Sequence, residues 1–141
     1  MPAYESVEQF QNIFNEFWKR ALEVTEVVDK IRKEKIIVRF DIEEPDLKFW
    51  LNFRDPGPDG TIGTLSWDSG EEPTVAVWSK SDTTNKFWQG KLSTAAAVAK
   101  GQVKISGSAM KAISLASKIK PLFPVYVGVL KDMGLEEYVV E

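Results

Sequence analysis

The sequence predicts an α+β domain in which helices cover one face of an antiparallel β-sheet. Three observations lead to this fold class. Apolar residues recur at three- and four-residue steps over 7–33, five later segments alternate apolar with polar residues, and a second helical stripe follows residue 109. The 141 residues suffice for a core, and we expect residues 1–141 to form a single domain.

The first predicted helix begins at a capping box formed by Ser6 and Gln9 and continues to about Lys33. Its apolar residues are too widely spread for one narrow stripe, so we expect contacts with apolar neighbours on more than one side. Helices that lie on anionic membranes carry Lys and Arg on their polar face, which favours packing within the protein here. The polar face instead carries four glutamates: Glu8, Glu16, Glu23 and Glu26.

The five alternating segments each predict a strand with one buried face. They cover residues 36–42, 47–53, 63–67, 75–77 and 103–105. Turn residues separate the first four, which predicts a ladder of hairpins. Further helices are predicted at 81–89, at 94–99 and after Gly107, where Pro121 must interrupt the helix. The segment PVYVGV beyond it fits a helix, and its β-branched residues leave a strand as the alternative.

Composition disfavours several classes of function. The formal net charge is −3, and Lys and Arg are spread along the chain without a basic stripe, so no nucleic-acid partner is expected. Cysteine and histidine are both absent, which removes thiolate nucleophiles, the commonest general base and the commonest zinc ligands. The acidic turns at 43–46 and 68–72 lack the spacing of a calcium loop. We therefore expect no enzyme activity, catalytic residue, metal or cofactor.

Location and assembly follow from the same inspection. The first ten residues lack a basic-then-apolar secretion signal, and no apolar run approaches the ~20 residues of a spanning helix, so a cytoplasmic location is expected. Two of the five tryptophans, Trp50 and Trp78, fall on the strand faces opposite the regular apolar set. We interpret them as packing beneath a helix, at a sheet edge or at a homodimer contact, in preference to contacting a ligand.

The stretch 88–107, WQGKLSTAAAVAKGQVKISG, is the most specific part of the chain. Gly90 can end one helix, Ser93 can cap a short alanine-rich helix, and Gly101 can stop it before a strand. The stretch resembles the sterol carrier protein family. Members carry Gly-Lys-Leu or Gly-Lys-Met after a helix, then a short helix containing Ala, then a strand Gly-x-φ-Lys-φ-x-Gly with φ apolar. The matching residues are Gly90-Lys91-Leu92, Ala97 and 101–107.

The order of the other predicted elements is also similar to the family's over nearly the whole chain. The resemblance implies a five-stranded mixed sheet, helices over one face and a hydrophobic tunnel between sheet and helices. It implies non-enzymatic binding and intracellular transfer of an apolar lipid: a fatty acid, a fatty acyl-CoA, a phospholipid or a sterol. Transient membrane contact fits such a carrier. The alternative is an accessory or protein-interaction domain that acts with a lipid-metabolising enzyme.

One departure from the family bears on the ligand. Val98 and Ala99 stand where relatives often have two bulky aromatic residues. The lost volume either widens the expected cavity or is refilled by other residues such as the many Trp and Phe, and in both cases the expectation of a sterol is weakened. We predict that eleven residues hold the ligand: Phe40, Phe49, Leu51, Ala99, Val103, Ile105, Met110, Ile113, Tyr126, Val129 and Leu130.

Overall fold

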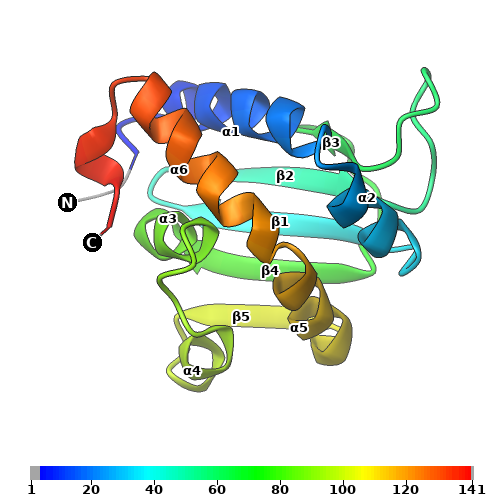
Figure 1. Cartoon of the computed structure of the whole chain (residues 1–141). Helices are drawn as coiled ribbons and strands as arrows, with labels where there is room; N and C mark the ends of the chain where they lie inside the picture. Colours follow the sequence, from blue (N-terminus) through cyan, green and yellow to red (C-terminus); the bar gives the residue numbers. More distant parts are fainter. Residues whose placement is uncertain (1–3, 141) are drawn as a thin grey trace.

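The computed structural model describes residues 4–140, in which a five-stranded sheet carries helices over one face (Figure 1). The strands lie in the spatial order β3-β2-β1-β4-β5, and only β1 and β4 are parallel neighbours. The sheet is therefore mixed, as the family resemblance implied. Its strands are β1 (Ile37–Glu43), β2 (Leu47–Asn52), β3 (Thr64–Ser66), β4 (Val75–Lys80) and β5 (Val103–Gly107).

The first two steps of the predicted hairpin ladder are confirmed, since β1 pairs with β2 and β2 with β3 in antiparallel fashion. The position of β4 shows that the last step was wrong. β4 pairs with β1, with Val77 opposite Phe40, and does not follow β3 as a hairpin partner. The connection from β3 passes the sheet face that the helices leave uncovered, where the Trp50 indole N–H donates to the Glu71 carbonyl at 3.0 Å. Alternation identifies the buried face of a strand but not its neighbour, so the turn residues suggested the wrong pairing.

The helices form one layer over the sheet (Figure 1). The predicted capping box is present, because the Gln9 N–H donates to Ser6 Oγ at 3.1 Å. The single helix predicted up to Lys33 is wrong, since Val24 leaves the helical conformation and a second helix begins in a new direction. The helices are α1 (Val7–Ala21), α2 (Thr25–Arg32), α3 (Ser81–Trp88), α4 (Thr94–Ala99), α5 (Ala109–Lys118) and α6 (Phe123–Asp132), with 3-10 turns η1 (Lys120–Leu122) and η2 (Glu136–Tyr138).

The core between α1, α6 and strands β1 and β2 is packed with aromatic rings. Phe14 and Phe17 are buried on α1, and each lies 5.2–5.8 Å, between ring centroids, from Trp88 and Tyr126. The segment PVYVGV belongs to α6, so the helical alternative is the observed one, and its buried residues join this core. Such close aromatic packing leaves little free space in this half of the molecule.

The length and hydropathy of the helices can be compared with those of a membrane-spanning helix. Within residues 4–140, no single helix is both long and apolar enough to cross a bilayer. By length and composition alone, α5 and the following segment Lys120–Asp132 reach that threshold together, as a pair bent by 47°.

Candidate functional site

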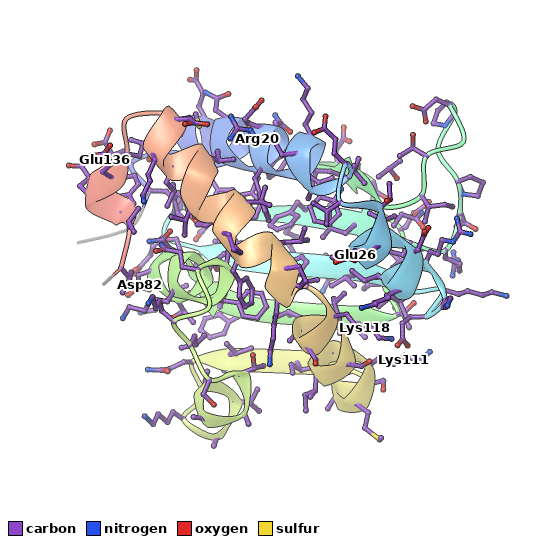
Figure 2. All side chains as sticks on the ribbon, in the orientation of Figure 1. Arg20, Glu26, Asp82, Lys111, Lys118 and Glu136 are labelled. Atoms are coloured by element: carbon purple, nitrogen blue, oxygen red, sulfur yellow. The ribbon has the colours of Figure 1, made fainter. Side chains whose placement is uncertain are left out.

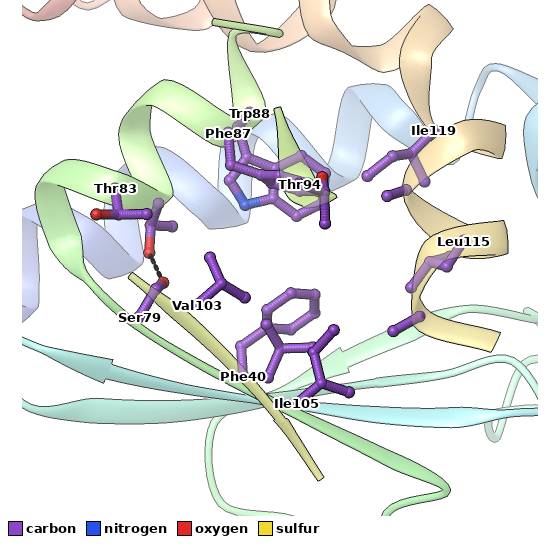
Figure 3. A pocket seen from close by; sticks show the side chains of 14 residues that line it. Phe40, Ser79, Thr83, Phe87, Trp88, Thr94, Val103, Ile105, Leu115 and Ile119 are labelled. Atoms are coloured by element: carbon purple, nitrogen blue, oxygen red, sulfur yellow. Dashed lines mark hydrogen bonds between the residues drawn. The ribbon is translucent and has the colours of Figure 1, made fainter. Parts of the chain in front are cut away.

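A small apolar cavity lies between the β4–β5 edge of the sheet and helices α3 and α5 (Figure 3). Its volume, counted as the space open to the centres of water molecules, is about 40 Å³. This volume holds about three waters. Ten of its lining residues are apolar, four carry hydroxyls and none is charged. The lining consists of Phe40, Val77, Ser79, Thr83, Thr84, Phe87, Trp88, Thr94, Val103, Ile105, Ala112, Leu115, Ala116 and Ile119.

Helix α5 creates this space by turning its small residues toward the sheet. Ala112 and Ala116 are one helical turn apart and both line the cavity. The direction of α5 is fixed where it leaves β5. Gly107 has φ 91°, and a Cβ at this position would collide with the Thr74 carbonyl oxygen. Ser108 then caps the helix by accepting a hydrogen bond from the Lys111 N–H at 3.2 Å.

The connection between α3 and α4 forms another wall. Gly90 has φ 74°, and a Cβ here would lie 2.7 Å from a ring carbon of Phe123, so only glycine lets this turn pack against that ring. Ser93 caps α4 by accepting from the Ala96 N–H at 3.3 Å. Because α4 begins directly after this cap, Thr94 lies against the cavity.

Two polar features face the apolar lining. The hydroxyls of Ser79 and Thr84 hydrogen-bond to each other at 2.7 Å, and Thr84 also donates to the Lys80 carbonyl at 3.2 Å. The indole N–H of Trp88 is buried and has no acceptor among the described residues. Figure 3 shows this nitrogen on the side of the ring toward Val103 and Ser79. An unpaired buried donor costs about 1–3 kcal/mol.

A wider surface groove adjoins the cavity. Its volume, counted in the same way, is about 400 Å³. The groove runs between residues 90–94 and the segment from α5 to α6. Phe87, Thr94 and Ala116 line both the groove and the cavity, so these three side chains separate the two spaces. The rest of the groove is lined by Gly90, Leu92, Ser93, Ile113, Ser117, Lys120 and Phe123.

Comparison with known proteins identifies this arrangement. The sequence profile of the SCP-2 sterol transfer family matches residues 14–120, which is most of the chain. The chain belongs to this family. The resemblance predicted from residues 88–107 is thereby confirmed. Comparison of this SCP-2 family sequence with curated proteins gave no significant match.

Solved structures agree on the SCP-2 fold. The sterol carrier protein domain 2 of Helicoverpa armigera is 21% identical, with a TM-score of 0.57 over 84% of this chain and 87% of that chain. Sterol carrier protein 2 from Yarrowia lipolytica, in its apo form, is 15% identical, with a TM-score of 0.55 over 83% and 88%. At these identities the likeness establishes the fold, and the tunnel implied by the resemblance stays a prediction.

The same fold also occurs inside a larger protein. The stereoselective inverting sec-alkylsulfatase Pisa1 from Pseudomonas sp. is 20% identical, with a TM-score of 0.54 over 64% of this chain. The match covers only 14% of the sulfatase chain. The SCP-2 fold is therefore found both as most of a solved chain and as a minor part of one.

The structure distributes the eleven predicted ligand residues of this SCP-2 family member over three environments. Phe40, Val103 and Ile105 line the cavity. Ile113 lines the groove and is 51% exposed, while Met110 is 83% exposed and Ala99 is exposed at the end of α4. The other five are buried in the packed core: Phe49, Leu51, Tyr126, Val129 and Leu130.

Sequence reasoning missed the residues that α3 and α5 contribute to the cavity. The predicted residues Met110 and Ile113 lie on the outward side of α5, whereas the small side through Ala112 and Ala116 faces the sheet. The sequence does contain an indication of this face, because Ala112, Leu115 and Ala116 lie on one side of the helix. Small residues on a helix that adjoins a sheet indicate either close packing or room beside them.

Apart from the indole N–H of Trp88, the polar side-chain groups on the cavity wall are hydroxyls, and they lack the partners of a catalytic site. Ser79 and Thr84 bond to each other and to a backbone carbonyl, with no carboxylate, lysine or histidine among the lining residues. Between residues 4 and 140, no cluster of three acidic side chains is arranged to hold a metal ion. Near this cavity the described side chains thus offer solvation for a ligand but no activated nucleophile.

A buried polar network lies beside the cavity, around Tyr126 of α6. Its hydroxyl is 2.6 Å from that of Tyr4 and donates to Asn85 Oδ1 at 2.7 Å. The Nδ2 of Asn85 and the Nε2 of Gln89 both donate to the Tyr138 carbonyl at 2.9 Å. Burial raises the pKa of Tyr126 well above its usual range, so this phenol stays neutral. The network joins both ends of the described chain to α3 and α6.

Proposed function

We propose that this SCP-2 family member binds the hydrocarbon chain of a lipid, without catalysis, in the cavity between β4, β5, α3 and α5, and transfers it between donors and acceptors. The observation that supports this most directly is the uncharged, mainly apolar lining of the cavity. Each methylene buried there contributes about 0.8 kcal/mol. A site with this chemistry gains affinity from chain length alone and needs no catalytic group.

The same lining limits where a charged head group can lie. Burying a carboxylate or phosphate without a charged partner costs several kcal/mol, and none of the fourteen lining residues is charged. The head group of a fatty acid or phospholipid therefore stays outside, in the groove at Thr94 and Ala116 or beyond it. The space of about 40 Å³ is too small for a lipid chain, so binding requires α4 or α5 to move away from the sheet.

Trp88 adds a preference to this proposal. Its unpaired N–H on the cavity wall can donate to an uncharged acceptor such as an ester carbonyl or a hydroxyl. Phe at this position keeps most of the ring and removes the donor. We expect Trp88→Phe to weaken binding of a long-chain methyl ester about fivefold and to leave the affinity for an alkane of equal length unchanged. Equal losses for ester and alkane would show that only ring volume matters.

An accessory role with a lipid-metabolising enzyme is the second candidate. It is favoured by the occurrence of the same fold as a minor part of the sec-alkylsulfatase chain. The two candidates differ in what the isolated chain does, because a carrier binds lipid by itself whereas an accessory domain requires its enzyme.

Native mass spectrometry of the purified protein tests the proposal. The carrier function predicts a population whose mass exceeds that of the chain by one lipid, or the appearance of that population after delipidated protein is incubated with C16 fatty acids and esters. Absence of any one-to-one complex with C12 to C18 ligands, from protein that is folded by circular dichroism, would contradict it. Restored binding in the presence of an enzyme partner would then support the accessory role.

A further inference from the structure

The charges of this chain are separated along the sequence. Residues 83–131 contain eight of its 18 basic residues and none of its 21 acidic residues, so their formal charge is +8 and that of the remainder is −11. Lys and Arg are spread along the whole chain, so the separation arises from the uneven placement of the acidic residues. A net charge of −3 therefore describes neither part of the molecule.

The basic segment includes α6, which packs against α1, but its elements α4, β5 and α5 lie together at the end of the molecule away from α1 (Figure 1). Figure 2 shows Lys111 and Lys118 at this end, on the α5 side. Four lysines are exposed here and form no ion pair with any residue in the described range 4–140: Lys91, Lys100, Lys111 and Lys120.

Opposite charge reaches this side at one place. Glu34, from the chain after α2, pairs with Lys118 and accepts a hydrogen bond from Ser114 at 3.1 Å. Lys104 lies over the ring of Trp78, with its Nζ 4.7 Å from the centroid. These contacts occupy Lys118 and Lys104. Lys111 lies near enough to Glu34 to interact with its charge without forming an ion pair, whereas the other three of the four exposed lysines have no ion-pair partner within residues 4–140.

Exposed aliphatic side chains occur among these lysines. Met110 is 83% exposed and Ile113 is 51% exposed. Three-residue spacing places them on one line of α5, which continues toward Lys120. Ile113 and Lys120 also line the groove beside the cavity. We name the outward side of this segment, from Met110 to Lys120, the α5 face. Met110 lies at its centre, Ile113 and Lys120 lie on the flank toward the groove, and Lys111 lies on the opposite flank.

We propose that the α5 face docks on an anionic lipid surface, with Met110 and Ile113 entering the acyl boundary and Lys111 and Lys120 against the head groups. This inference rests on the proposed function, because docking in this orientation presents the groove and the cavity behind it to the membrane. Aliphatic side chains framed by lysine fit an interface where acyl chains meet anionic head groups. The N-terminal helical region carries four glutamates that the same surface repels: Glu8 and Glu16 on α1, Glu23 after it and Glu26 on α2.

A membrane accounts for this face better than a nucleic acid does. Arginine, amide side chains and exposed aromatic rings are the groups that most often read or stack on bases, together with lysine at guanine. The α5 face carries lysine but none of the other three kinds of group, and residues 83–131 contain no arginine. Its exposed Met110 gains free energy only from an apolar environment.

Vesicle sedimentation of the full chain tests the proposal. We expect the protein to sediment with vesicles of phosphatidylcholine containing about one third phosphatidylserine, and to be released from them by 0.5–1 M NaCl, on the order of the salt that shortens the Debye length to about 3 Å. The double variant Lys111→Glu and Lys120→Glu should bind at least about 30-fold more weakly, since each lysine contributes about fivefold in affinity. Glu at position 111 completes a capping box with Ser108, so α5 remains stable.

The matched control makes the same charge change elsewhere. Lys19 and Lys30 are exposed on α1 and α2, and the variant Lys19→Glu with Lys30→Glu should bind vesicles within about twofold of the wild type, the small loss reflecting long-range repulsion. Met110→Ser should reduce binding about fivefold or more without changing the melting temperature. Loading of wild-type protein with a fluorescent fatty acid, in solution without vesicles, tests the carrier function separately.

Three outcomes would overturn the docking proposal. They are equal binding to neutral and anionic vesicles, equal losses for the two double variants, and lysine-dependent binding of an RNA oligomer at physiological salt in place of vesicles. Loading without docking would leave the carrier function standing, and docking without loading would remove it while keeping the membrane surface.

Discussion

The helical layer over the sheet packs differently in its two halves, with large side chains in one and small side chains in the other. Over β1 and β2, α1 and α6 contribute large side chains such as Phe14, Phe17 and Tyr126, which pack without room for a ligand. Over β4 and β5, α5 contributes Ala112 and Ala116, and a cavity remains. The difference shows how one small fold obtains both stability and a binding site. Aromatic packing on one side offsets the contacts that the other side gives up.

The largest expected effect contrasts a side chain from each region. Phe17→Ala should reduce the free energy of unfolding by about 3–5 kcal/mol, because it leaves a large void in close-packed surroundings. Ile105→Ala should cost only about 1–2 kcal/mol, since this half-buried residue already borders empty space. Urea unfolding of both variants measures the contrast. Equal losses would mean that the cavity side is as tightly packed as the aromatic side.

Filling the cavity should change lipid binding strongly and stability only slightly. Ala112→Leu adds volume where α5 faces the sheet, so it should lower lipid loading at least about tenfold while changing the unfolding free energy by about 1 kcal/mol or less in either direction. Ala109→Leu, on an exposed position of the same helix, is the matched control. Ala99→Trp is a second control, because its position is exposed outside the cavity. Unimpaired loading of Ala112→Leu would place the ligand elsewhere.

A smaller effect is expected from the polar network that borders both regions. Tyr126→Phe removes the hydroxyl between Tyr4 and Asn85 and should lower the unfolding free energy by about 1–2 kcal/mol, because buried partners are left unpaired. Tyr138→Phe removes a longer, partly exposed hydrogen bond to Gln9 and should cost about 0.5 kcal/mol or less. Thermal or urea unfolding of the two variants settles the order.

The smallest expected effect is pH-dependent and involves the contact of α5 with the chain after α2. Hydrogen bonds from Lys118 and Ser114 hold the pKa of Glu34 below its usual value. The folded state therefore binds this proton less readily than the unfolded state, and the stabilisation is present above the unfolded pKa of about 4.5. Glu34→Gln should cost up to about 1 kcal/mol at pH 7.

The difference between wild type and Glu34→Gln should then shrink as the pH falls through the lowered pKa of Glu34. Urea midpoints measured from pH 7 to pH 3 give this profile. A difference that grows on acidification would show that the carboxylate has no favourable partner in the folded state.

Sequence patterns predicted the elements of the fold better than their arrangement. Alternation located every strand, because each strand carries apolar residues at alternate positions, even where residues of both faces are buried, as in β2. It could not show that β4 lies parallel to β1, since pairing depends on the path of the β3–β4 connection and not on the pattern within a strand. The family resemblance that rests on the motif glycines did imply a mixed sheet. Two of these glycines, Gly90 and Gly107, lie where a Cβ would collide with a neighbouring residue.

The candidate site was harder to predict than the fold. Phe40, Val103 and Ile105 could be placed at the cavity because strand alternation defines their side of the sheet. The facing of α5 could not be read from its pattern, because its large and small sides are both apolar. It depends on contacts with residues distant in the sequence, such as the ion pair between Glu34 and Lys118.

Ligand-to-protein NOEs test the central claim most directly. Protein with isotope-labelled methyl groups is mixed with an unlabelled C16 methyl ester, and filtered NOEs identify the methyls that contact the chain. We predict NOEs to Val103, Ile105 and Leu115, on the cavity wall, and none to Val129 or Leu130, in the packed core. NOEs confined to the methyls of α6, from protein that binds the ester, would contradict the account.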